Sequence, residues 1–417
     1  MHIMEEINRT TLKIEYESII IKKQNYLIKK KESVLLKMKI AIVNTWAISR
    51  KAIGGTERFV MDLAKSFAEN NNQVDVFMFS GKSHKEDGVN YININLFNMD
   101  GEADEYIVQK AFGNFETNKS YTNLAKQLEN KIDMRKYDFI QLNSLLFLEA
   151  WTNKKRIFTI HTNPFEYKLA WGEKSYKKVL EIMKKYKDNE LTKFVAPSEF
   201  YANEYSKLTD CSVNFIPHAI DVTRLETIKT KNEINTQYNL NDEKLKIIVP
   251  SRLEPKQKQP QLLLEACCLM NNEDKAKFEI IYTGLDKQYE KFVDSLTTKA
   301  KENNVDIKII RFDYMSEVYK IADVCVLSSK SESFGYSALE SLSLGIFTIL
   351  NDIPTFNEIA KGNDNNYIFK NCVEELKNKL LYVINNYDEF KRKLPNERWQ
   401  EQYNMERFEN AYINVIK

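Results

Sequence analysis

Two glutamates eight positions apart, Glu332 and Glu340, carry the strongest chemical signal in the sequence. They belong to a segment, 328–340, that follows an apolar run, contains Gly335 and continues into small residues typical of a closely packed helix. We expect Glu332 in a loop and Glu340 in the following helix, about 12 Å away at the helical rise per residue. Amides exposed at a helix start donate to phosphate or sugar oxygens, and glycine admits a ligand close to the backbone. The two carboxylates are therefore candidates for opposite ends of one extended ligand, whereas the simpler alternative is two unrelated solvated glutamates.

A cationic segment, 250–260, forms the second candidate and contains Arg252, Lys256 and Lys258 directly after another apolar run. Arginine offers a planar fork of donors and lysine a mobile point charge, a combination suited to a diphosphate leaving group. A loop with three cations is also an ordinary solvated surface. Its position after a strand and before a helix favours the phosphate site.

Two further segments, at His161 and at Gly54-Gly55, have the right position for ligand contact. His161 ends an apolar run and begins a Thr-Asn-Pro loop, which favours a ligand contact over a structural role. Gly54-Gly55 precedes a helix whose amides face outward, although such a pair is often a plain turn. The absence of a G-x-G-x-x-G pattern there disfavours a nicotinamide dinucleotide site.

The elements that position these residues alternate between short β-rich runs and amphipathic helical runs from Met38 onward. Such alternation is typical of parallel α/β units. The first series predicts strands at 39–44, 74–79, 139–142, 156–160 and 193–196, with helices at 56–69 and 199–207. The second series predicts strands at 246–250, 278–283, 306–312, 323–328 and 347–350, with helices at 260–270 and 336–344. The sequence therefore predicts an α/β fold of two doubly wound, Rossmann-like domains, 38–218 and 222–394, facing a cleft at the carboxyl ends of their strands.

Composition excludes several classes of protein. The 61 basic and 59 acidic side chains give a net charge of +2, so no chain-wide field indicates nucleic acid as a partner. The sequence has no run of 18 apolar residues, which argues against a membrane span. Four histidines without metal-ligand spacing predict no metal site. The five cysteines form no C-x-x-C pair and are expected to be reduced thiols of a cytoplasmic protein.

Two basic segments leave a membrane question open. The extension 1–37 is either a helical or poorly ordered tail, or a stretch upstream of a start at Met38, or a contact with a membrane or partner. The segment 176–187 combines apolar residues at helical spacing with five lysines, which suits the surface of an anionic membrane. Any surface helix has the same pattern.

Taken together, the motifs resemble a known family. Gly54-Gly55, His161, the 216–221 stretch, Ser251-Arg252-Leu253 and Glu332-x7-Glu340 occur in the order found in retaining glycosyltransferases of family 4, the glycosyl transferases group 1. The resemblance runs from Met38 to Lys417 and implies the GT-B fold. It makes 38–218 the acceptor domain and 222–394 the nucleotide-sugar donor domain, with a C-terminal helix, 395–417, that crosses back to the acceptor domain.

The resemblance also implies a role for each motif. Arg252 and a following lysine would neutralise the donor diphosphate, and Glu340 would bind the nucleotide ribose. Glu332 would contact the donor sugar, His161 would face its C6 side, and the Gly54-Gly55 loop would lie beside phosphate and acceptor. Backbone groups near the helix start would complete the donor site, at Ser333, Phe334, Gly335 and Tyr336.

Departures from the family pattern leave some assignments open. The family's lysine, counted forward from Arg252, falls on Gln257, whereas counting back from the next helix favours Lys258 over Lys256. His218 replaces the more usual Asn of the hinge and is interpreted as structural. These departures affect the identity of the nucleotide more than the fold.

The expected function is transfer of a sugar, with retention, from a nucleotide diphosphate sugar, preferably UDP-linked, to a glycan, lipid-linked or protein acceptor in cell-surface polysaccharide or glycoconjugate synthesis. The resemblance implies no cofactor and no bound metal, and it suggests a protein that is cytoplasmic or peripheral at the inner face of the membrane. A sugar-nucleotide 2-epimerase of the same fold and an inactive interaction subunit of a transferase complex are the alternatives.

Overall fold

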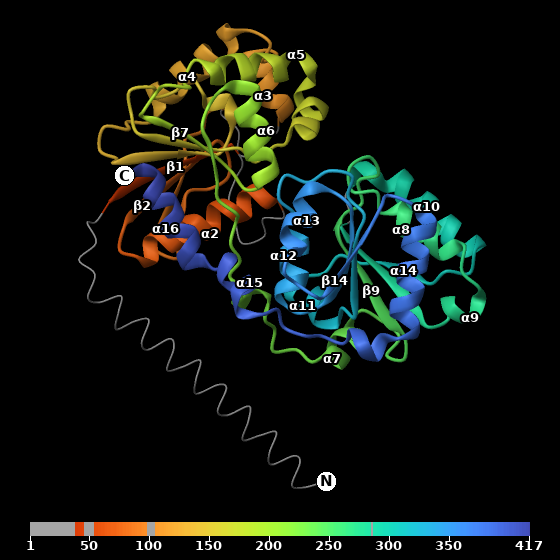
Figure 1. The fold of residues 1–417 in the computed structure, drawn as a ribbon. Coiled ribbons are helices and arrows are strands. Elements are labelled where there is room, and N and C mark those ends of the chain that lie inside the picture. The colour runs from red at the N-terminus through yellow and green to blue at the C-terminus, as the bar shows by residue number, and fades with distance from the viewer. Residues whose placement is uncertain (1–37, 46–53, 98–104, 285–286) are drawn as a thin grey trace, which may run out of the picture.

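Two sheets, each flanked by helices, form the cores of two lobes (Figure 1). The structure is a computed structural model that describes residues 38–45, 54–97, 105–284 and 287–417. The predicted extension 1–37 lies outside the described residues. The two α/β lobes confirm the predicted pair of Rossmann-like domains.

The N-terminal sheet has the strand order β3-β4-β2-β1-β5-β6-β7-β8, and all its pairs are parallel except β3 with β4. Strands β2 to β4 are added on one side of β1, and strands β5 to β8 are added on its other side. The β1/β5 pair is therefore a topological switch point. Its strands are β1 (Lys39–Asn44), β2 (Gln73–Met78), β3 (His84–Glu86), β4 (Val89–Asn93), β5 (Phe139–Leu142), β6 (Arg156–Thr159), β7 (Thr192–Ala196) and β8 (Val213–Phe215). Its helices are α2 (Gly55–Glu69), α3 (Glu105–Phe112), α4 (Asn118–Lys131), α5 (Pro164–Lys184) and α6 (Glu199–Thr209), with the short η1 (Leu145–Phe147).

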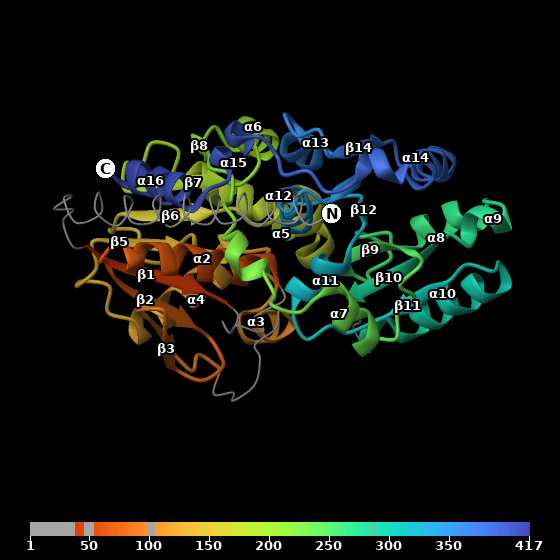
Figure 2. The ribbon, with the colours of Figure 1, turned by 90° about the horizontal axis from the view of Figure 1, so that it is seen from below.

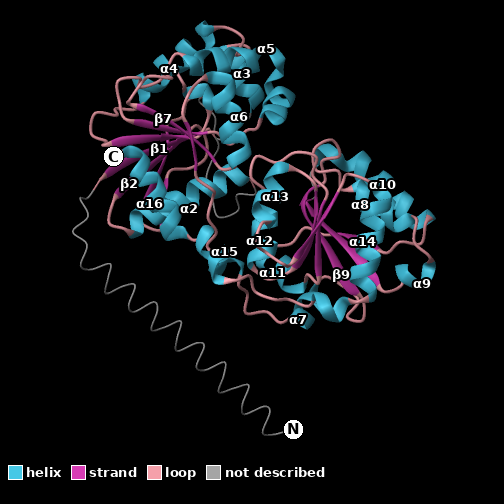
Figure 3. Cartoon of the chain, viewed as in Figure 1, coloured by secondary structure: helices cyan, strands magenta, loops and turns pink. Residues whose placement is uncertain are grey.

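The C-terminal sheet has the order β11-β10-β9-β12-β13-β14, is parallel throughout, and reverses its direction of growth between β9 and β12. Figure 3 shows its strands enclosed by helices. The strands are β9 (Leu245–Arg252), β10 (Phe278–Gly284), β11 (Ile307–Ile309), β12 (Val324–Leu327), β13 (Phe347–Asn351) and β14 (Asn366–Phe369). The helices are α7 (Lys231–Gln237), α8 (Gln261–Cys268), α9 (Asn272–Lys275), α10 (Glu290–Glu302), α11 (Met315–Ile321), α12 (Tyr336–Ser343), α13 (Pro354–Ala360) and α14 (Val373–Asn385), with the short η2 (Val222–Leu225), η3 (Lys287–Tyr289) and η4 (Tyr387–Phe390).

The C-terminal segment crosses back to the first lobe, as predicted, and its end lies beside the N-terminal sheet in Figures 1 and 2. The single helix expected at 395–417 is wrong in detail, because the chain forms α15 (Glu397–Gln402) and α16 (Met405–Ile416). The break occurs at Asn404, whose side chain accepts a hydrogen bond from the Arg407 amide at 2.7 Å and so caps α16. α16 packs on α2, where Ser66 Oγ donates to Glu409 at 2.7 Å.

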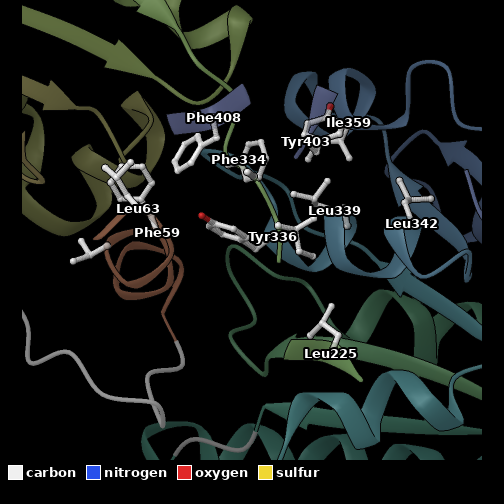
Figure 4. Close-up of a cluster of buried hydrophobic side chains, with 14 of the residues drawn as sticks. Phe59, Leu63, Leu225, Phe334, Tyr336, Leu339, Leu342, Ile359, Tyr403 and Phe408 are labelled. Carbon is white, nitrogen blue, oxygen red and sulfur yellow. The ribbon is translucent and has the colours of Figure 1, made fainter. Parts of the chain in front are cut away.

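One aromatic cluster joins the two lobes (Figure 4). Phe59 comes from α2, Phe334 from the loop before α12, Tyr336 from the first position of α12, and Phe408 from α16. His218 lies among them, with its ring centroid 4.8 Å from that of Phe334 and 5.4 Å from that of Tyr336. His218 is buried, and burial holds its pKa well below its usual range. A neutral ring packed on four aromatics agrees with the structural role predicted for His218.

Candidate active site

The switch point of the C-terminal sheet brings the two strongest sequence segments into contact. The loop after β9 carries the cations, and the loop after β12 carries Glu332. Ser328 Oγ donates to the Lys258 carbonyl at 3.1 Å and to the Gln259 carbonyl at 2.7 Å. The Lys330 amide donates to the Gln257 carbonyl at 2.7 Å. The two loops therefore form one surface at the carboxyl ends of adjacent strands.

Glu254 organises the cationic loop. Its buried carboxylate accepts the backbone amides of Lys256 at 2.9 Å and Lys258 at 3.3 Å, and also that of Gln257. The turn leaves Lys256 exposed, whereas Lys258 Nζ lies 2.6 Å from Glu332 Oε1. Of the two lysines that the sequence left open, Lys258 is the one that the fold brings to Glu332. Sequence reasoning missed Glu254, although its place two residues after Arg252 was visible.

Arg252 is exposed at the end of β9, next to Gly284 of β10. A Cβ atom at Gly284 would lie 2.2 Å from the Ser251 carbonyl oxygen, so only glycine allows this backbone approach. Gly284 therefore has a clear steric role. It lets the strand ends close up beneath the Arg252 loop.

Glu332 is held from two sides at the mouth of its loop. Its Oε1 accepts from Lys258 and from Ser329 Oγ, the latter at 2.7 Å. Gly335 then takes a φ of 103°, and a Cβ atom there would lie 2.8 Å from the Phe356 ring. Glycine is required at this position for both reasons, and α12 begins at the next residue.

Glu340 lies in α12 as predicted but is enclosed by side chains of both lobes. It is buried. Its Oε1 accepts from Arg58 and, at 3.0 Å, from Arg224, while Tyr319 donates to Oε2 at 2.7 Å. Glu340 could contact a ribose only if some of these hydrogen bonds break, so the ribose role stays a prediction. Sequence reasoning did not anticipate either arginine.

Asp62 extends this buried cluster within the N-terminal lobe. Arg224 lies 3.2 Å from its carboxylate. Burial raises the pKa of Asp62 to about 6, and the nearby guanidinium of Arg224 opposes that shift. Two acids and two arginines thus meet where the linker joins the domains.

The remaining residues predicted for the donor site fall into three groups. The rings of Phe334 and Tyr336 are buried in the aromatic cluster. Only the backbone of these two residues could therefore contact a nucleotide sugar. Gly55 packs closely against Tyr336, since a Cβ atom at Gly55 would lie 3.4 Å from the Tyr336 ring. Gly54 precedes Gly55 in the chain. Ser333 instead takes part in a link across the domains, because its Oγ accepts from the Asn163 amide at 2.8 Å.

His161 faces a pocket of about 110 Å³ at the switch point of the N-terminal sheet. Its Nε2 lies 3.2 Å from Asn143 Oδ1, and its ring meets Phe59 edge to face at 4.6 Å. Burial lowers the pKa of His161 to about 3, so the ring is neutral at physiological pH. The pocket is otherwise lined mainly by amides, hydroxyls and aromatics that include Asn44, Thr45, Thr56, Asn143, Ser144, Thr159, Thr162, Tyr167 and Trp171.

The amphipathic segment 176–187 uses its apolar face within the fold. Tyr176, Val179, Met183 and Tyr186 are buried in the core of the N-terminal lobe. Its lysines lie outside, and Lys178 and Lys185 pair with neighbouring glutamates. The pattern that suggested a membrane surface is therefore accounted for by packing. No helix in the described part of the chain is both long and apolar enough to cross a bilayer.

A metal centre was not expected, and the described residues contain no group of three or more His, Cys, Asp or Glu side chains placed to hold an ion. The candidate cations of the site include Arg252 and Lys258. Both stand at the carboxyl end of β9, on the side of the sheet edge where ligands bind in this class of fold.

Comparison with known proteins identifies similar chains for both lobes. The model of Glycosyltransferase Family 4 matches residues 53–224, and that of Glycosyl transferases group 1 matches residues 230–401. A comparison with curated proteins finds no match.

Solved structures of similar fold cover nearly the whole chain. Sucrose-phosphate synthase from Thermosynechococcus elongatus is 15% identical, with a TM-score of 0.72 over 91% of this chain and 98% of the other. HepE from Anabaena, solved in complex with UDP-glucose, is 14% identical, with a TM-score of 0.66 over 91% and 99%. WaaG, a glycosyltransferase involved in lipopolysaccharide biosynthesis, is 14% identical, with a TM-score of 0.63 over 89% and 95%. At these identities the likeness establishes the fold.

Proposed function

Because this chain belongs to the group 1 glycosyltransferases of the GT-B fold, we propose that it transfers a sugar from a UDP-sugar to an acceptor hydroxyl with retention of configuration. The observation that carries the proposal is the contact between Lys258 and Glu332 at the β9/β12 switch point, beside the exposed Arg252. Lys258, proposed to bind the diphosphate, contacts Glu332, proposed to bind sugar hydroxyls. The UDP-glucose complex of HepE supports UDP as the nucleotide of the donor.

In the proposed reaction the bond between the sugar C1 and the diphosphate oxygen breaks as the bond from the acceptor oxygen to C1 forms. The acceptor attacks on the face from which UDP leaves, and the leaving phosphate oxygen takes the acceptor proton. Arg252 and Lys258 stabilise the negative charge that grows on the diphosphate, a preorganised electrostatic effect that needs no metal. Glu332 accepts hydrogen bonds from the sugar and keeps Lys258 in place.

We propose that His161 faces the C6 side of the donor sugar and that the acceptor enters through the pocket beside it. A neutral imidazole and several amides and hydroxyls suit hydrogen bonds with sugar hydroxyls. We propose a glycan, lipid-linked or protein acceptor, in cell-surface polysaccharide or glycoconjugate synthesis. We propose that the enzyme is peripheral at the inner face of the membrane, where the exposed lysines of 176–187 add long-range attraction to anionic lipid.

The test is incubation of the protein with a panel of UDP-sugars, with and without glycan and lipid-linked acceptors, followed by mass spectrometry. We expect UDP to be released only when acceptor is present. EDTA should not change this release. A Lys258→Met variant should lose about 100-fold or more in rate, the scale of removing one donor to developing charge, and Lys256→Met should lose far less. Conversion of the donor into an isomer of equal mass, which chromatography ahead of the mass spectrometer separates, would indicate an epimerase, and failure to bind any UDP-sugar would contradict the proposal.

A further inference from the structure

The start of α5 makes a second set of contacts with the donor loops. Glu166 lies in the first turn of this helix, five residues after His161. Its Oε1 accepts from Gln257 Nε2 at 2.6 Å, and its Oε2 accepts from Ser333 Oγ at 2.6 Å. Asn163, which caps α5, also donates through Nδ2 to Ser331 Oγ at 2.8 Å.

These contacts join three segments that are far apart in the chain. Gln257 belongs to the loop after β9 and sits next to Lys258, while Ser333 sits next to Glu332 in the loop after β12. Gln257 Nε2 also donates to the Ser331 carbonyl at 3.1 Å. One carboxylate from the N-terminal lobe thus holds both loops that carry the candidate donor residues.

We propose that Glu166 is a positioning residue that fixes Gln257 and Ser333, and through them Lys258 and Glu332, when the two domains close on the donor. The proposal rests on the function proposed above for the same site. Glu166 has both oxygens engaged by protein donors, so it acts through the loops. It also explains why glutamine at 257, where the family lysine was expected, is compatible with a working loop, because Lys258 supplies the charge and Gln257 the link.

The closed arrangement, in which Glu166 contacts Gln257 and Ser333 across the two lobes, should depend on pH because Glu166 is a carboxylate. Burial and, secondarily, the neighbouring Glu332 raise the pKa of Glu166 from 4.5 to about 7. When the domains separate and Glu166 meets water, its pKa returns towards the ordinary value. The closed arrangement therefore binds a proton more tightly, so closure is favoured at low pH and loses stability as pH rises through this window. The link itself survives protonation, since the Ser333 hydroxyl can accept as well as donate.

The two tyrosines that face Glu166 from α6 do not titrate against this trend. Lys258 and Glu332 face it from the donor loops, and Tyr201 and Tyr205 face it from α6. Burial raises the pKa of Tyr201 to about 12 and that of Tyr205 well above its usual value. Both tyrosines stay neutral across the window in which Glu166 ionises.

The test compares Glu166→Ala, Glu166→Gln and a control, Glu173→Gln, just beyond the kink of α5 at Gly172, where Glu173 forms surface pairs with Lys168 and Lys177. With UDP-sugar and acceptor, Glu166→Ala should lower kcat/KM about tenfold or more, as expected for losing hydrogen bonds to a charged group. Glu166→Gln retains the shape and one acceptor oxygen and should recover much of that loss. Its pH profile should lack the change near pH 7 that the wild type and Glu173→Gln show.

A second readout keeps this inference separate from the proposed function. Hydrogen exchange of segments 256–260 and 329–335 needs no turnover, and it should quicken in Glu166→Ala relative to Glu173→Gln at the same pH. If the wild type transfers no sugar but this exchange difference appears, the proposed function fails and the positioning role stands. Equal exchange in the two variants, or an unchanged pH profile in Glu166→Gln, would overturn the role of Glu166.

Discussion

Replacing Glu340 by glutamine would leave two guanidinium groups without their shared counter-charge at the junction of the lobes. The wild-type carboxylate accepts from Arg58, Arg224 and Tyr319, and its side chain is 1% exposed. Glutamine has nearly the same shape but only one acceptor oxygen. Its amide group would point a donor at a donor on one side.

The loss of stability in Glu340→Gln can be scaled from the exposure of the two arginines that contact Glu340. Removing one member of a buried ion pair costs about 3–5 kcal/mol, because the other charge stays buried and unpaired. The side chains of Arg58 and Arg224 keep 17% and 25% exposure, and Arg224 retains Asp62, so we expect the lower end, about 3 kcal/mol. That loss is a large part of the usual stability of a domain.

Urea denaturation followed by circular dichroism measures this loss. The matched control is Glu265→Gln, since Glu265 pairs with Lys299 at side-chain exposures of 36% and 44% and such pairs contribute about 1 kcal/mol or less. Adding Arg58→Met to Glu340→Gln should restore part of the stability, because it removes an uncompensated charge. If Glu340→Gln denatures at the same urea concentration as Glu265→Gln, the buried cluster does not hold the lobes as described.

Three further predictions concern single residues. Gly335→Ala should lower the melting temperature and the transfer rate together, at about 1–3 kcal/mol of strain, because alanine meets the Phe356 ring at a φ of 103°; a melting curve that matches the wild type would refute it. Gly284→Ala should disturb the Arg252 loop and weaken UDP binding in a calorimetric titration, and unchanged affinity would count against the close strand approach. The pKa of His161 is about 3 in the folded protein and near 6.5 when unfolded, so the free energy of unfolding should rise with pH between these values, and His161→Asn should flatten that rise in acid denaturation curves.

The fold was predictable because its central strands are unmistakable in the sequence. The 39–44 and 324–327 runs are apolar and β-branched, and their ends mark the switch points where the site forms. The strands that escaped prediction, β3, β4, β8 and β14, are short and partly polar, as edge strands and their neighbours often are.

The side chains of the site were predictable only where their own local segment, a loop directly after a strand, marks them. Lys258 and Glu332 stand out because each follows a strand. Glu166 and Arg58 gain their meaning from partners 91 and 282 positions away, and no local spacing encodes such contacts. Glu340 shows the same limit, since its place in the helix was anticipated and its enclosure by two arginines was not.

The central claim is that Arg252 and Lys258 bind the diphosphate of a nucleotide donor at the β9/β12 edge. Calorimetric titration of the wild type and of an Arg252→Ala, Lys258→Met double variant with UDP and with uridine measures this directly. The account predicts that the wild type prefers UDP to uridine by about tenfold or more, on the scale of two ionic hydrogen bonds, and that the double variant loses this preference while still binding uridine. An equal preference for UDP in both proteins would contradict it.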